Sequence, residues 1–304
     1  MANLTNLVAL QNEIVPAALE LAKMRIKVDR LRQFVHFGEG PASQVAVVES
    51  VQVGAPAAAT VADRAAMMTV TRANDVLTKT TAYTPFRTWS QLTWPEINKL
   101  IENNALLDEM ASGLVRCWGA VLARVRAIIT GSVATETIPD IGGGTDFLAA
   151  THTNIDATTY ANLGTPALTT ASFQDGVDAM TLEQDWTGEF TNAEPNVLIS
   201  SSAQKNHAIV KSAYGSSALD ANIGEGMGQV VLPGLGDFWA LSTGPSRKSI
   251  RVDFRKKGAA GDPGGLPYVL PAREEQGQVF IEYGADFAGY ALTHIGLWIS
   301  NGTT

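Results

Sequence analysis

The chain has 304 residues, which is enough for one large domain or two ordinary domains with a sizeable core. Only 17% of the residues are charged and the formal net charge is -8, a composition that argues against a basic nucleic-acid-binding surface. The first residues show neither a basic leader nor a small-residue cleavage site, so we expect a protein that is made and folded in a cytoplasm, with no membrane segment.

The N-terminal segment, residues 1–36, begins with a mixture of apolar and polar residues and continues with a sequence rich in Ala, Leu and charged residues. Residues 17–32 are predicted to form a helix, in which Glu20 has Lys23 at helical spacing. Two roles stay open for this segment. It is either an arm that lies on another subunit or a simple surface helix.

The next segment, residues 37–92, is rich in Val and Thr, as strands are. SQVAVVESVQV (43–53) predicts one strand, and MTVTRANDVLTKTTAYTPF (68–86) predicts more extended chain, with a turn at Ala73-Asn74-Asp75. Together they describe a long hairpin with a tip of small residues. An isolated two-stranded ribbon is marginal in water, so the hairpin must lie on another surface, and a neighbouring subunit is the natural candidate.

A long apolar periodicity runs from Thr93 to Gly131 and predicts one continuous helix of roughly 55 Å. Thr93 and Glu96 have the spacing of a capping box, and Gly131 is a suitable stop. Charged residues along this helix exclude a membrane span, and the absence of a heptad disfavours a coiled coil. We therefore expect the spine of an extended subunit, with the single cysteine, Cys117, as a buried structural thiol.

Two glycine clusters and one polar loop suggest ligand sites only weakly. The run Gly142–Gly144 lacks the Lys-Ser/Thr of a phosphate loop, and Gly224, Gly226 and Gly228 precede a strand-like VVL instead of a helix. His152 has no second metal ligand near it in the sequence. We therefore predict no catalytic, cofactor-binding or metal-binding residue and no cofactor.

The second half of the chain alternates between helix and strand signals. SFQDGVDAMTLEQDW predicts a helix that begins at Ser172, with Asp175 as its capping partner. A strand at Val197–Ser200 is followed by a predicted helix over residues 202–213. SIRVDF predicts a strand before the small basic cluster Arg255–Lys257, and QVFIEYGADFAGYALTHIGLWIS predicts two final strands.

The serines of Ser200–Ser202 and His207 superficially imitate a hydrolase nucleophile with its base. The sequence lacks the G-x-S-x-G elbow of α/β hydrolases, and Ser202 is more naturally the cap of the following helix. A hydrolase is therefore only a minor alternative.

The order of these parts resembles the major capsid protein of tailed bacteriophages, with its Hong Kong 97-type fold, which encapsulin nanocompartments share. DFLAATHTN (146–154) is similar to a Leu-Phe…His…Asn stretch of Mu-like major head subunits, although the pair here is Phe147-Leu148. SFQDGVDAMTLEQD followed by PNVLISSSAQKNHAIVKS is similar to the family's helix, Pro-x-x-Leu strand and helix. The resemblance covers about residues 30–300 and rests on the order of the parts.

The resemblance implies an α+β fold with five parts. They are an N-terminal arm (1–36), an extended loop or E-loop (37–92), the spine helix and peripheral domain (93–150), a mixed α/β axial domain (151–276) and strands returning to the core (277–304). Relatives that crosslink use a lysine, and Lys79 is the only lysine of the hairpin. We expect Lys79 to be a surface charge and no crosslink to form.

The implied function is structural: the chain self-assembles into an icosahedral virion shell around double-stranded DNA, and it is not an enzyme. The implied partners are further copies of the chain in hexamers and pentamers, joined through E-loop and N-terminal-arm contacts. A portal and a separate scaffolding protein, or none, are also implied, and a decoration protein stays open. DNA would be enclosed without specific binding, and no membrane takes part. An encapsulin-like compartment is the main alternative.

Overall fold

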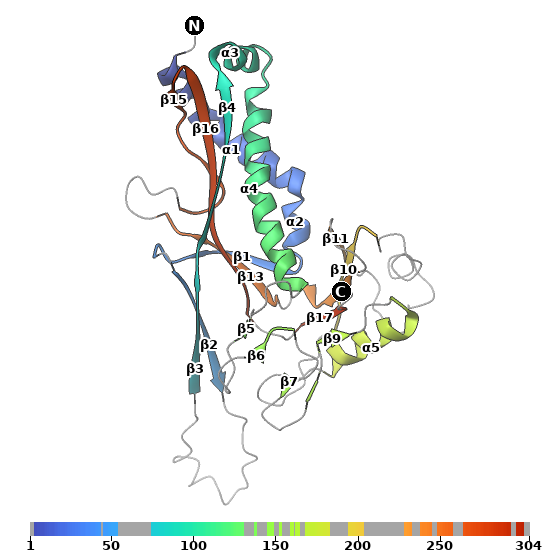
Figure 1. Cartoon of the computed structure of the whole chain (residues 1–304). Coiled ribbons are helices and arrows are strands. Elements are labelled where there is room, and N and C mark those ends of the chain that lie inside the picture. The colour runs from blue at the N-terminus through green and yellow to red at the C-terminus, as the bar shows by residue number, and fades with distance from the viewer. Residues whose placement is uncertain are drawn as a thin grey trace, which may run out of the picture.

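The computed structural model describes residues 3–43, 45–53, 74–130, 137–138, 145–148, 152–153, 159–160, 162–164, 168–182, 194–203, 228–232, 238–244, 248–257, 264–292 and 296–300. These residues form the mixed α+β subunit that the sequence predicted, with helices and two larger sheets (Figure 1). No helix in these ranges is long and apolar enough to cross a membrane.

A six-stranded sheet is built around one long strand, β16 (Gln278–Ala291). Its other strands are β1 (Val35–Gly40), β4 (Thr84–Thr93), β13 (Ile250–Arg255), β14 (Tyr268–Val269) and β15 (Arg273–Glu275). β4 pairs antiparallel with β16 from Thr84↔Phe287 to Thr93↔Gln278, and β1 runs parallel to β13. Odd-numbered residues of β16 from Val279 to Phe287 are buried, because that face packs against the spine.

The spine differs from the single helix that we predicted. It consists of α3 (Trp94–Glu102) and α4 (Leu106–Ile129), separated at Asn103-Asn104-Ala105. Asn104 has the left-handed φ of 53°, and the N–H groups of Asn104 and Ala105 bond to the carbonyls of Ile101 and Leu100. This is a Schellman C-cap, which asparagine tolerates better than most residues. The continuous helix was therefore wrong, and α4 alone spans about 36 Å.

The start of the spine follows the predicted capping pair. The backbone N–H of Thr93 donates to Glu96 Oε2 at 2.7 Å, and the Thr93 hydroxyl donates to the same oxygen at 2.8 Å. The hydrogen bonds from the Thr93 backbone and then from its hydroxyl lower the pKa of Glu96. The carboxylate therefore stays charged at the positive end of α3. Cys117 is buried in α4, as predicted.

The N-terminal helix is longer than predicted. α1 covers Leu4–Ile26 and is capped by Asn3, and after a left-handed Lys27 the short α2 covers Val28–Leu31. α1 packs along α4 of its own chain, and the Gln11 amide bonds to the backbone of the segment between β14 and β15. Within its own chain, α1 therefore lies along the spine.

A second, five-stranded sheet has the order β11-β10-β12-β17-β9. The strands are β9 (Leu163–Gly164), β10 (Val197–Ser201), β11 (Gly228–Leu232), β12 (Trp239–Ser242) and β17 (Leu297–Ser300). Both faces of this sheet are buried. Val197 and Ile199 join the main core, whereas Leu198 packs with Trp239 and Trp298 beneath α5 (Thr170–Thr181).

The predicted start and capping partner of the helix near Ser172 need correction. α5 begins after Thr169, which accepts the Ser172 N–H at 3.1 Å, so Ser172 is the capping partner and Asp175 lies inside the helix. In the strand pairing, β13 belongs to the sheet of β16, and β17 belongs to the sheet of β10. Two short pairs complete the described strands, β5 (Thr137–Ile138) with β6 (Thr145–Asp146) and β7 (His152–Thr153) with β8 (Thr159–Tyr160).

Candidate assembly site at the long hairpin

The predicted hairpin is formed by β2 (Val45–Val53) and β3 (Asn74–Ala82), which leave the six-stranded sheet as a separate two-stranded ribbon (Figure 1). The strands pair antiparallel from Val45↔Ala82 to Val53↔Asn74. At about 3.3 Å per residue the nine pairs extend roughly 30 Å. The predicted turn at Ala73-Asn74-Asp75 was wrong at its last two positions, because Asn74 and Asp75 belong to β3.

The register assigns the ribbon's residues to two chemically different faces, since neighbouring strand positions alternate. The face with the odd positions of β2 holds Val45, Val47, Glu49, Val51 and Val53 opposite Ala82, Thr80, Thr78, Val76 and Asn74. The other face holds Ala46, Val48, Ser50 and Gln52 opposite Thr81, Lys79, Leu77 and Asp75. The first, which we call the valine face, is the more apolar.

The ribbon's root is held by a buried tyrosine. Tyr83 is the residue between β3 and β4, and its hydroxyl donates to the carbonyl oxygen of Pro41 at 3.0 Å. Its ring packs with Ala288 and Tyr290 of β16 in a small cluster apart from the main core. The Tyr290 hydroxyl in turn donates to the carboxylate of Asp253, which is 2% exposed.

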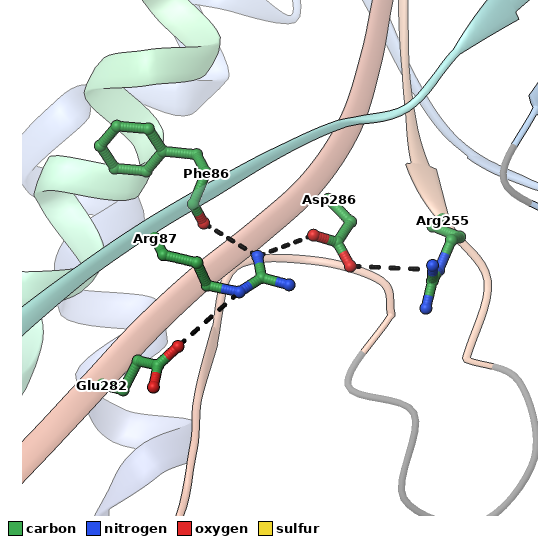
Figure 2. A network of polar contacts seen from close by, with 5 residues as sticks. All are labelled: Phe86, Arg87, Arg255, Glu282 and Asp286. Atoms are coloured by element: carbon green, nitrogen blue, oxygen red, sulfur yellow. Dashed lines mark hydrogen bonds and ion pairs between the residues drawn. The ribbon is translucent and has the colours of Figure 1, made fainter.

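A charged network lies further along the same strands (Figure 2). Arg87 Nη1 donates to Asp286 Oδ1 at 2.7 Å and to the carbonyl of Phe86 at 3.0 Å, and Arg87 Nε lies 3.8 Å from Glu282 Oε1. Arg255 Nε approaches Asp286 Oδ2 at 4.0 Å from β13. The network joins β4, β13 and β16 where the chain turns into the hairpin.

The environment of this network keeps its groups in their usual charge states. Burial, the largest single influence, would lower the pKa of Arg87. The hydrogen bond to Asp286 and the charges of Tyr268, Asp286 and Glu282 together outweigh it, so the pKa is raised and the guanidinium stays charged. The Arg87 guanidinium also lies 5.3 Å from the ring centre of Tyr268. Burial and then the Asp286 charge raise the pKa of Tyr268 to about 12. These are the properties of a rigid joint between strands.

Two serines of the alternative hydrolase site are buried inside a sheet. Ser200 and Ser201 are buried in β10, an inner strand of the five-stranded sheet. Ser202 follows β10 and is exposed. His207 and most of the helix expected over 202–213 lie outside the described residues. Gly142–Gly144, Gly224 and Gly226 lie outside them as well. Gly228 begins β11, which contains the strand-like VVL of the prediction.

The remaining predicted positions are placed by their strands. His152 lies in β7, and Lys79 lies in β3 opposite Val48. Among the described residues, no three or more His, Cys, Asp or Glu side chains gather as a metal site. Of the predicted basic cluster, Arg255 lies in β13 within the charged network, whereas Lys256 and Lys257 are exposed.

The sequence did not predict the polar contacts at the root of the hairpin, which involve Tyr83, Arg87, Asp253 and Asp286. The sequence does contain a signal for buried carboxylates, because Asp253 and Asp286 each interrupt an apolar strand sequence, VDF and GADF. A carboxylate inside such a strand is either exposed or paired when buried. The partners could not be named, because Asp286 and Arg87 are 199 residues apart in the chain.

Comparison with solved structures agrees with this architecture. The chain is similar to the subunit of a virus-like particle from Pyrococcus furiosus, with a TM-score of 0.51, 10% identity, and coverage of 95% of this chain and 98% of the other. It is also similar to the mature capsid of bacteriophage PhiM1, with a TM-score of 0.52, 8% identity, and coverage of 88% and 85%.

At these identities the likeness shows a shared fold, and it extends over nearly the whole of each chain. A scan of protein-family models and a search of curated proteins find no match. The chain therefore has the Hong Kong 97-type fold of phage capsid subunits, as the resemblance predicted.

Proposed function

We propose that this chain is a major capsid protein, which assembles by itself into an icosahedral virion shell around double-stranded DNA. The observation that carries the proposal is the capsid fold over nearly the full length of the chain, with a long ribbon that has no core of its own. The role is structural and non-enzymatic.

The hairpin is the part that we propose to act as the E-loop, with its valine face on a neighbouring copy of the chain. A strip of roughly 30 by 10 Å buries about 300 Å² per side, well below the about 800 Å² that each partner gives to a typical stable interface. One such contact is too small for a stable dimer. Repeated in closed pentamers and hexamers, many such contacts become cooperative.

The receiving surface includes exposed apolar area on the body of the subunit. Trp89 of β4 is 59% exposed and lies opposite Glu282 on the face of the sheet away from α4. Tryptophan is enriched in protein–protein interfaces relative to the rest of a protein surface. We therefore propose that Trp89 forms part of the surface on which a neighbour's hairpin lies.

The remaining parts follow the same proposal. The spine with the sheet around β16 would form the peripheral domain, and the five-stranded sheet with α5 the axial domain around the symmetry axes. The exposed face of α1 would supply the N-terminal contacts. A portal and a separate scaffolding protein are the expected partners, and Mu-like head subunits the expected subfamily, with assembly in a host cytoplasm. The net charge of -8 suits a shell that encloses DNA without binding it specifically.

An encapsulin-like compartment is the second candidate, since the similar particle from Pyrococcus furiosus is described only as virus-like. The contents of the particles decide between the two. Shells purified from cells that contain the whole gene neighbourhood would hold nuclease-protected double-stranded DNA if the chain is a capsid protein. Shells that hold one defined protein and no DNA would favour the compartment.

The docking of the hairpin has a matched test. Val47 and Val48 are neighbours of the same residue type on opposite faces of the ribbon. We expect Val47→Asp to raise the concentration needed for assembly by about tenfold or more, because a charge replaces an apolar contact worth at least about 1.4 kcal/mol. Val48→Asp should assemble nearly as the original chain does, measured by sedimentation velocity. Equal effects of the two variants would contradict docking through the valine face.

A further inference from the structure

We propose that Tyr83 is a latch that fixes the direction in which the hairpin leaves the subunit, and that it thereby helps to set the curvature of the assembled shell. The inference rests on the proposed assembly role for its consequence. The latch itself is a property of the single subunit.

The first observation is the position of Tyr83. It is the residue at which the chain passes from the ribbon, ending at Ala82, to the six-stranded sheet, beginning at Thr84. Its hydroxyl crosses to the other leg of the hairpin and donates to Pro41 O at 3.0 Å, just below the first ribbon pair, Val45↔Ala82. One side chain therefore ties both legs together at the root.

The second observation is the space that Gly40 leaves for this side chain. A Cβ at Gly40 would lie 2.0 Å from the Tyr83 hydroxyl oxygen and 3.3 Å from Asp253 Cβ. The carbonyl of Gly40 is itself held by the N–H of Lys256 at 3.1 Å, which limits the backbone's freedom to withdraw. Any larger residue at position 40 would thus expel the tyrosine hydroxyl.

The third observation is the platform beneath the ring. Tyr83 rests on Ala288 and Tyr290 of β16, and the Tyr290 hydroxyl binds Asp253 of β13. Arg251 Nε donates to Asp253 Oδ1 at 2.7 Å, which balances that buried charge. The latch therefore orients the ribbon against two strands of the main sheet and not merely against its own other leg.

The platform also keeps the latch in its donating form. Burial, followed by the neighbouring Asp253 charge, raises the pKa of Tyr83, so its phenol remains protonated and able to donate to Pro41 near neutral pH. A tyrosine that only filled space would not need the hydroxyl. Its replacement by phenylalanine would change little beyond a general loss of stability.

The experiment compares Tyr83→Phe with Tyr268→Phe by hydrogen–deuterium exchange of the unassembled chain. Tyr268 is the matched control because its buried hydroxyl has no hydrogen-bond partner among the residues that the structure describes. Loss of one net hydrogen bond of about 1 kcal/mol should speed exchange about fivefold in the amides of β2 and β3 near the root. The five-stranded sheet should exchange as before. Tyr268→Phe should leave the ribbon unchanged.

The consequence for assembly is read from particle diameters by electron microscopy. Tyr83→Phe and the stronger Gly40→Ala are expected to broaden the distribution of shell diameters, while the Tyr268→Phe control gives the original distribution. Uniformly faster exchange throughout the Tyr83→Phe subunit, or unchanged exchange in the ribbon, would overturn the latch. If the original chain forms no shells while the ribbon exchange changes as expected, the capsid function fails and the latch stands. Unchanged diameters with faster ribbon exchange would overturn its role in curvature.

Discussion

Gly113 of α4 faces the ring of Tyr283 of β16 so closely that no side chain fits between them. A Cβ at Gly113 would lie 2.3 Å from Tyr283 Cζ and 2.4 Å from two further ring atoms. Both residues are buried, and Tyr283 is 0% exposed. The glycine thus sets the distance between the spine helix and the long strand.

The substitution Gly113→Ala should destabilise the subunit by about 1 to 3 kcal/mol, because α4 must move away from β16 or Tyr283 must leave its site. Gly119 on the same helix is the matched control, since a Cβ there meets nothing within 4 Å. Gly119→Ala should stabilise by about 0.5 to 1 kcal/mol through helix propensity. Urea unfolding of the unassembled chain measures both, and equal effects would contradict the close approach.

The charged joint of Figure 2 predicts an asymmetric response to mutation. Asp286→Ala should cost about 3 kcal/mol, because it removes the 4% exposed carboxylate that pairs with Arg87 at 2.7 Å and lies 4.0 Å from Arg255. The exposed Glu20–Lys23 pair is the control, and Glu20→Gln should change stability by less than about 0.5 kcal/mol. A loss below about 1 kcal/mol for Asp286→Ala in thermal unfolding would refute the joint.

Alkaline pH should destabilise the subunit through its buried tyrosines. Burial raises the pKa of Tyr283 from the ordinary value of 10.0 to about 12. Burial, followed by the hydrogen bond to Asp253, also raises the pKa of Tyr290. Their contribution is full below the unfolded pKa of 10.0 and is lost as pH rises through the folded values. Stability should fall by up to ~1.4 kcal/mol per pH unit per tyrosine above pH ~10.

The measurement is the urea midpoint of the unassembled chain between neutral pH and about pH 11.5, with tyrosinate absorbance followed at 295 nm in parallel. Tyr283→Phe should reduce the slope of stability against pH in the alkaline range. A stability that does not change across that range would contradict neutral phenols in the folded state.

Cys117 should be inert in the folded chain. Burial raises the pKa of its thiol from 9.0 to about 12, so the thiolate fraction falls by about a thousandfold relative to an exposed cysteine, and the side chain is 0% exposed. A thiol reagent such as a nitrobenzoate disulfide should react at pH 8 only after denaturation. Rapid stoichiometric labelling of the native chain would contradict this packing.

Local patterns predicted the elements that depend on neighbouring residues. The Val-rich alternation of 45–53 became β2, the apolar run at 197 became β10, and SIRVDF became β13, because strand signals and their boundaries are written within a few residues. Pairing over long sequence distances was not predictable in the same way. The two final strands were predicted, but not that β17 pairs with β12 and β9, in a different sheet from β16.

The break in the spine shows how a strong period can hide a short signal. Apolar residues continue at helical spacing on both sides of Asn103-Asn104, so the periodicity favours one helix. Two adjacent asparagines are poor helix formers and good residues for a left-handed cap. The joint at the hairpin root was harder still to predict, since the partners of Asp253 and Asp286 are brought together only by sheet formation.

The most direct test of the proposed function is the state of the purified chain alone. We would concentrate it, with and without crowding agents and salt, and examine it by negative-stain electron microscopy together with mass photometry. The capsid account predicts closed shells, or rings of five and six subunits, with the ribbons bridging adjacent subunits. A chain that stays monomeric or dimeric at high concentration, with a candidate scaffolding protein present as well as absent, would contradict it.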